Sequence, residues 1–169
     1  MFSFCYTKQK MDLQILIGLL LTVLPIVELR GGLPVIVEWA VRNKVSVWPW
    51  FILVLFLNIL VIFFIFAFLD FLHERFMGFR WYSKFMGGYL KKIEKKSEKI
   101  MKKMENWGFV ALALFVAIPL PGTGAWTGSF VAWFLKLNRI KSIIAISIGV
   151  IIAGTIILLA SLGFFNSIY

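Results

Sequence analysis

The sequence predicts an all-α polytopic membrane protein, and two features indicate this class. Of the 169 residues, 61% are hydrophobic and 17% are aromatic, and the mean hydropathy is +0.91, so a soluble domain of this size could not bury the apolar surface. Two apolar stretches, Val47 to Leu69 and Ile143 to Phe165, would each reach roughly 34 Å as helices, slightly more than the ~30 Å hydrocarbon core. We expect both to be transmembrane helices.

Basic charge is concentrated in one segment of the chain. The formal net charge is +10, and residues 71–107 alone hold ten basic and four acidic side chains. Within this segment, "GGYLKKIEKKSEKIMKKMENWG" repeats apolar residues every three or four positions among lysines, which is the pattern of a basic amphipathic helix. Such an excess is typical of the cytoplasmic side of a membrane, where anionic headgroups attract it. We therefore expect residues 71–107 to form a cytoplasmic linker, and we expect no nucleic-acid partner.

The chain lacks the residue sets that redox, metal or covalent chemistry requires. The single cysteine, Cys5, cannot form an internal disulfide, and no His/Cys cluster has metal-ligand spacing. No nucleophile–base pair stands in the Pro/Gly-rich stretches described below. We therefore expect no cofactor, no metal and no enzymatic activity. Lys8 and Lys10 before an apolar run imitate a signal peptide, but no small-x-small cleavage site follows, so we expect this segment to be retained.

Two further apolar stretches are too short to cross a bilayer. As helices, Leu13 to Val27 and Phe109 to Leu120 would reach only roughly 22 and 18 Å, and each ends in a Pro/Gly-rich break. A second short apolar piece and a polar turn follow each break. The sequence therefore predicts two repeats, 1–70 and 108–169, each with a helical hairpin (13–41 and 109–135) before its transmembrane helix.

The layout of the halves leaves two topologies open. Pro25 precedes Trp39 by the same spacing as Pro119 precedes Trp133, which supports a repeat. If each hairpin re-enters the membrane and returns to its own side, the repeats are inverted and the two breaks meet near the midplane. If each hairpin crosses fully, the repeats are parallel. The short arms favour re-entry, and the basic linker then places both termini outside.

The two breaks supply the candidate substrate-binding residues. Glycine lets backbone amides approach a ligand, each helix that follows a break presents its positive dipole end, and Arg30 adds a permanent charge, so the combination suits an anionic group. Non-helical backbone at membrane depth has polar groups that lipid cannot satisfy, so it occurs only where it is buried in protein or lines a water-filled cavity. A binding site at the two breaks would be such a cavity. The candidates are Glu28, Arg30, Gly31, Gly32 and Pro34 in "ELRGGLP", and Pro119, Pro121, Gly122, Thr123, Gly124, Trp126 and Thr127 in "PLPGTGAWTG".

Two acidic residues are candidates for proton coupling, Glu28 and Glu38. Burial of Glu28 would favour its neutral acid, whereas the neighbouring Arg30 would favour its carboxylate, and the sequence does not decide between them. A structural role is the alternative: Glu28 and Arg30 could form a static ion pair, and "PGTG" could be only a turn. Ionisable groups at membrane depth are costly, which favours function for Glu28 and Arg30.

The motifs also resemble a known family. "ELRGGLP" and "AIPLPGTGAWTG" closely resemble the signature stretches of the small multidrug export membrane protein family, and the resemblance runs from about Leu19 to Gly154. That family looks distantly related to the DedA and VTT-domain superfamily, whose members have paired re-entrant hairpins and include lipid scramblases and proton-linked transporters of polyprenyl phosphates. One departure matters: DedA proteins carry arginines in the second hairpin, whereas residues 109–135 hold no charge here.

The resemblance implies a transporter in the cell membrane. We expect translocation, in the manner of a flippase, of an amphipathic substrate between the two breaks, with an anionic lipid such as a polyprenyl phosphate as first choice. The alternatives are export of small, cationic drugs with Glu28 as counter-charge, and a membrane scaffold that transports nothing. Membrane lipids are the expected partners, and a homo-oligomer stays open.

Overall fold

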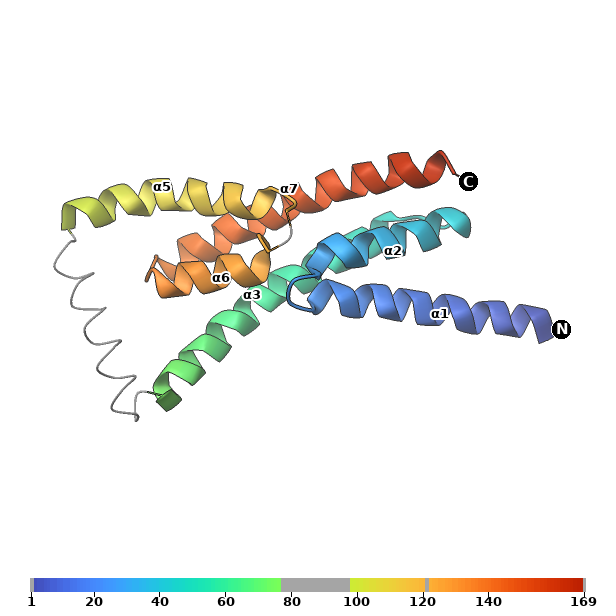
Figure 1. Cartoon of the computed structure of the whole chain (residues 1–169), viewed down its shortest axis with the longest axis horizontal. Helices are drawn as coiled ribbons and strands as arrows, with labels where there is room; N and C mark the ends of the chain where they lie inside the picture. Colours follow the sequence, from blue (N-terminus) through green and yellow to red (C-terminus); the bar gives the residue numbers. More distant parts are fainter. Residues whose placement is uncertain (1, 77–97, 121, 169) are drawn as a thin grey trace.

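A computed structural model describes the backbone of residues 2–76, 98–120 and 122–168, and the side chains from Leu13 onward within these ranges except those of 98–106 (Figure 1). The described residues form six helices and no strand, which confirms the predicted all-α class. The helices are α1 (Phe2–Val23), α2 (Glu28–Arg42), α3 (Trp48–Phe76), α5 (Glu98–Ala117), α6 (Ala125–Phe134) and α7 (Arg139–Asn166). Most of the predicted amphipathic linker lies outside the described residues.

Two helices, α3 and α7, are long and apolar enough to cross a membrane. They contain 29 and 28 residues, which correspond to roughly 44 and 42 Å, so each exceeds the ~30 Å hydrocarbon core. The predicted stretch Ile143–Phe165 lies within α7, and the stretch Val47–Leu69 begins one residue before α3. The last turns of α3 carry Asp70, His73, Glu74 and Arg75, which are suited to the headgroup region. By length and composition, both helices are therefore candidate membrane spans.

The remaining helices form two hairpins, and their breaks meet in the middle of the molecule (Figure 1). The first hairpin is α1 and α2, joined by the first break at residues 24–27; the second is α5 and α6, joined by the second break at residues 118–124. From the middle, the first hairpin extends toward the end where the C-terminus lies, and the second extends the opposite way. The second arm of each hairpin packs across the halves, α2 against α7 and α6 against α3.

Glycines allow close contact between helices, and Gly32 and Gly149 show this for the backbone. A Cβ added to Gly32 of α2 would overlap the Thr22 side chain and the Gly18 carbonyl of α1. A Cβ added to Gly149 of α7 would lie 2.7 Å from the Ala113 carbonyl oxygen of α5. The backbones of neighbouring helices therefore approach directly, as small residues permit in membrane proteins.

The ends of α2 and α6 share one capping geometry. In α2 the N–H groups of Lys44 and Val45 donate to the carbonyls of Val41 and Ala40; in α6 those of Lys136 and Leu137 donate to Trp133 and Ala132. Both lysines adopt a left-handed φ of 54°, which completes a Schellman motif in each half. In these caps Trp133 occupies the position equivalent to Val41, whereas the sequence spacing made it equivalent to Trp39. The two alignments differ because α2 and α6 have different lengths.

Candidate functional site

The first break is shorter than the sequence predicted. The glycines and proline of "ELRGGLP" were expected to be non-helical, but this expectation is wrong: Glu28 begins α2, and Gly31, Gly32 and Pro34 are helical. Residues 24–27 interrupt the helices instead, so the predicted arm from Leu13 to Val27 ends four residues early, at Val23. Packing of Gly32 against α1 supplies the stabilisation that its weak helix propensity lacks.

Strained backbone marks the start of α2. Ile26 has φ 78° and Glu28 has φ 48°, the left-handed region that non-glycine residues rarely adopt, β-branched residues least of all. Such conformations cost of order 1–3 kcal/mol each and persist where surrounding contacts hold them. At Glu28 these contacts come from the second hairpin.

The Glu28 side chain caps the first turn of α6. Its carboxylate Oε1 accepts a hydrogen bond from the backbone N–H of Trp126 at 2.9 Å, and Glu28 is only 3% exposed. The carboxylate also contacts Gly124, where an added Cβ would overlap both of its oxygens. A negative charge at a helix N-terminus is stabilised by the exposed N–H groups and by the helix dipole. Gly124 is therefore required to admit the acid.

Arg30 contacts the other side of the second break. Its Nη2 donates to the Thr123 hydroxyl at 2.8 Å and to the Ile118 carbonyl at 3.3 Å. That carbonyl directly follows α5 and belongs to the negative end of the helix, so a cation is favourable there. Glu28 and Arg30, two residues apart on α2, thus bind the start of α6 and the end of α5 respectively.

A further hydrogen bond joins the breaks in the reverse direction. The indole Nε1 of Trp126 donates to the Val23 carbonyl at 3.0 Å, which is the last residue of α1. Helix ends leave carbonyl groups that need partners. Each hairpin therefore satisfies backbone groups that the other hairpin leaves free at its break.

Beside Arg30 lies a groove with a volume of about 530 Å³. Arg30 and Pro34 of α2 line one side and Pro119 of the second break lines another; the long wall is α7 between Ile156 and Phe165. Within this groove Arg30 is the charged residue and Ser161 the neutral polar one. The groove is therefore polar at Arg30 and apolar along α7, which suits an amphipathic ligand.

Hydrogen-bonding capacity remains on Arg30. Its Nε and Nη1 are buried and have no hydrogen-bond partner among the described residues. Pro34 has no N–H, so the Arg30 carbonyl also lacks the donor that the fourth residue along normally provides in a helix. Because an unpaired buried donor costs about 1–3 kcal/mol, a ligand that accepts hydrogen bonds from Arg30 would recover that free energy.

The remaining candidates of the second break have other surroundings. Gly122 is exposed with φ 86°, where no added Cβ would meet an atom within 4 Å, so it serves the turn. Thr127 is half-buried in the first turn of α6, and Gly31 is half-buried in α2. Pro121 lies outside the described residues. Among the described residues of the second break, Pro119 lines the groove, and Thr123 and the Ile118 carbonyl bind Arg30.

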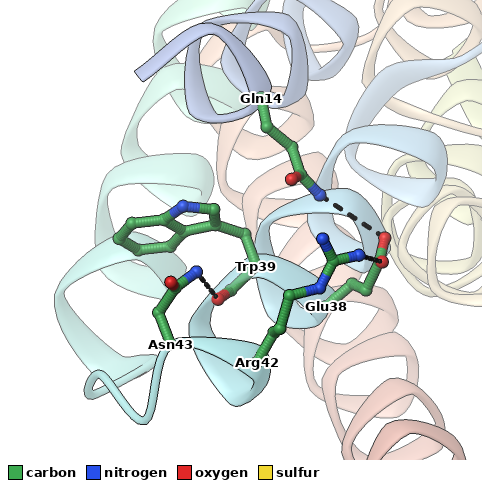
Figure 2. Close-up of polar contacts among 5 residues, drawn as sticks. All are labelled: Gln14, Glu38, Trp39, Arg42 and Asn43. Atoms are coloured by element: carbon green, nitrogen blue, oxygen red, sulfur yellow. Dashed lines mark hydrogen bonds and ion pairs between the residues drawn. The ribbon is translucent and has the colours of Figure 1, made fainter. Parts of the chain in front are cut away.

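Glu38, the second proton-coupling candidate, lies away from the breaks. Figure 2 shows it between Arg42 of α2 and Gln14 of α1, with Arg42 Nη2 at 2.7 Å and Gln14 Nε2 at 3.4 Å. Its side chain is 27% exposed. Ten residues of α2 separate it from Glu28, roughly 15 Å along the helix, so the structure does not bring the two acids together.

The α7 wall of the groove was missed by the sequence interpretation. Ser161, which is 7% exposed, and the apolar residues around it belong to a transmembrane stretch. Apolar residues that line a groove and those that face lipid have the same composition, so only the packing of α2 against α7 separates them. The one feature of this wall that the sequence could have indicated is Ser161, a polar residue within the apolar stretch.

Comparison with known proteins identifies a family. A family model described as "Putative small multi-drug export protein" matches residues 28–156, which include α2, α3, the second break and most of α7. No curated protein and no solved structure matches the chain.

Proposed function

The chain belongs to the small multi-drug export protein family, and on this basis we propose that it is a membrane transporter for an amphipathic substrate with an anionic head group. An anionic lipid such as a polyprenyl phosphate is the first candidate. The supporting observation is Arg30, a cation beside a largely apolar groove with two nitrogens that the protein leaves unpaired. Because both nitrogens are covered, the head group reaches them only when neighbouring side chains move apart.

An anion suits the site better than a cation does. The carboxylate of Glu28 already binds the Trp126 N–H and is buried, so a cationic substrate would have to draw it from the α6 N-terminus. Arg30, in contrast, retains donors. Charge-assisted hydrogen bonds from arginine to phosphate or carboxylate are among the stronger polar interactions in proteins.

Export of drug-sized molecules is the second candidate function. The family description names multi-drug export, and a groove of about 530 Å³ lies within the range of small-molecule sites, roughly 300–1,000 Å³. An anionic drug would use Arg30 as a lipid phosphate does. A cationic drug would depend on Glu28 instead.

The proposed transport mechanism uses the two hairpins. We take them to re-enter the membrane from opposite sides, because α2 and α6 reach only roughly 22 and 15 Å and the apolar part of α1 is equally short. In this topology the turn between α6 and α7 and the linker are cytoplasmic. The contacts of Glu28 and Arg30 across the breaks would form and separate as the hairpins move, and Glu28 could release α6 when it takes up a proton.

Transport in proteoliposomes tests this function. The variants are Arg30→Gln, which removes the charge, Arg30→Lys, which keeps it, and Arg42→Gln as the matched control on the exposed end of the same helix. Loss of charged hydrogen bonds worth about 1.5–3 kcal/mol predicts a roughly ten- to hundredfold loss of polyprenyl phosphate transport in Arg30→Gln. Arg42→Gln should transport normally.

Two other results would redirect the proposal. If a cationic dye is exported, export survives Arg30→Gln, and Glu28→Gln abolishes it, the cationic drug is the substrate. If none of the substrates moves with the unmodified protein, the scaffold alternative replaces transport. Glu28→Gln also tests coupling, because a proton-coupled carrier with this change would no longer respond to a pH gradient.

A further inference from the structure

The long wall of the groove consists of two parallel rows of α7 side chains. Ile157, Ser161 and Phe165 recur every fourth residue, as do Ile156, Ala160 and Phe164, so each row follows one face of the helix. Ser161 of the first row is buried, whereas Ile156 and Phe164 of the second row are 45% and 62% exposed. The first row is therefore the floor of the groove, and the second row is its rim at the lipid-facing surface.

The smallest side chain of the rim lies at its centre. Ala160 stands between the larger Ile156 and Phe164, and it is itself exposed. A small residue between two large ones on one helix face is the lowest point of the rim, and we call this position the notch. Because α7 has the length and composition of a membrane-spanning helix, the exposed rim faces lipid.

From these contacts we infer that the substrate enters the groove sideways from the lipid through the notch at Ala160, with its apolar chain along α7 and its anionic head group at Arg30. This inference rests on the proposed function and narrows its substrate to a membrane-dissolved amphiphile, such as a long-chain phosphate monoester. The charge of Arg30 at one end and the apolar wall at the other provide the complementarity. A water-soluble anion has no apolar chain that would contact the α7 wall.

Photoaffinity labelling of the full-length protein in liposomes tests the inference. The probe is dodecyl phosphate with a diazirine near the chain end, and the labelled peptide is identified by mass spectrometry. We expect labelling within residues 156–165 that excess dodecyl phosphate suppresses and inorganic phosphate does not. Suppression by inorganic phosphate to the same degree would mean that the site selects a free anion from water, and would overturn lateral entry.

Ala160→Trp and Leu159→Trp form a matched pair. Ala160 lines the groove, whereas the adjacent Leu159 is 64% exposed and does not. Ala160→Trp should therefore abolish labelling of residues 156–165, and Leu159→Trp should leave it intact. If the tryptophan variant does not fold, Ala160→Leu replaces it in the test. Leucine fills the notch with less bulk, so it should reduce labelling without abolishing it. Equal labelling in Ala160→Trp and Leu159→Trp would refute entry through the notch.

The outcomes separate this inference from the proposed function. If dodecyl phosphate transport depends on Arg30 but Ala160→Trp labels normally, the function stands and the lateral route is wrong. If labelling follows the expected pattern while the protein moves no substrate, the groove is a binding site for the amphiphile and the transport proposal fails.

Discussion

The carboxylate of Glu28 and the backbone N–H of Trp126 are 2.9 Å apart, and this hydrogen bond joins the first hairpin to the start of α6 in the second. Two residues further along α2, Arg30 binds the Ile118 carbonyl at the end of α5. The acid and the base of "ELRGGLP" therefore each complement the helix end of opposite dipole sign. This arrangement explains why charges interrupt an otherwise apolar stretch, and it brings the unpaired donors of Arg30 beside the groove.

Removal of the Glu28 carboxylate should destabilise the fold. Glu28→Ala leaves a buried N–H at the α6 N-terminus without its partner, and loss of a capping side chain costs about 0.5–2 kcal/mol. Glu28→Gln keeps an acceptor but loses the charge, so it should lower the free energy of unfolding by less than Glu28→Ala does. Unfolding in detergent, followed by circular dichroism, measures both. Glu74→Ala, which removes an exposed acid from the end of α3, should be neutral; equal losses in Glu28→Ala and Glu74→Ala would refute the cap.

Gly124→Ala should act like removal of the Glu28 cap without changing that residue. An added Cβ would overlap the Glu28 carboxylate, so the acid must leave the α6 N-terminus or the break must widen. Gly163→Ala is the matched control, because a Cβ there meets no atom within 4 Å. We expect a lower unfolding midpoint for Gly124→Ala alone. In the double variant Gly124→Ala/Glu28→Ala, the two losses should be less than additive, since both disrupt one contact.

Ile26→Gly should stabilise the protein. Ile26 adopts a left-handed φ of 78° while 75% exposed, so glycine would relieve about 1–2 kcal/mol of steric strain and sacrifice little packing. The same change at Ile140, which is 71% exposed in the first turn of α7, should instead cost up to about 1 kcal/mol. The unfolding midpoints of the two variants should move in opposite directions. A drop in both would show that the Ile26 side chain contributes more than its backbone costs.

The long helices were predictable from the sequence, whereas the start of α2 was not. Continuous apolar runs identify α3 and α7 because no other helix of the described residues combines their length with so apolar a composition. Gly31, Gly32 and Pro34 suggested an irregular backbone, since local propensity opposes a helix there. Contacts with Thr22 and Gly18 of α1 override that propensity, and they depend on a tertiary arrangement that local patterns do not encode.

The candidate site was predictable where it involves charged residues or residues of the two Pro/Gly-rich stretches, such as Pro119 and Thr123. Glu28 and Arg30 were identified because ionisable residues are costly within an apolar stretch. Their partners include the Trp126 N–H and the Ile118 carbonyl, and backbone groups leave no signal in residue type. The part of α7 that lines the groove was missed for a related reason. Its isoleucines and phenylalanines are the same residue types as those that face lipid, so residue type does not distinguish the two surfaces.

The accessibility of Lys44 and Lys136 tests most directly whether the hairpins enter the membrane from opposite sides. These lysines occupy equivalent caps after α2 and α6, and both are exposed. Figure 1 shows that α2 and α6 point in opposite directions from the two breaks. Lys44→Cys and Lys136→Cys would be introduced singly into a Cys5→Ser background and treated with a membrane-impermeant maleimide on intact cells and on inverted vesicles. We expect Lys44→Cys to react from outside and Lys136→Cys only from the cytoplasmic side. Reaction of both from the same side would contradict the opposed hairpins and the mechanism based on them.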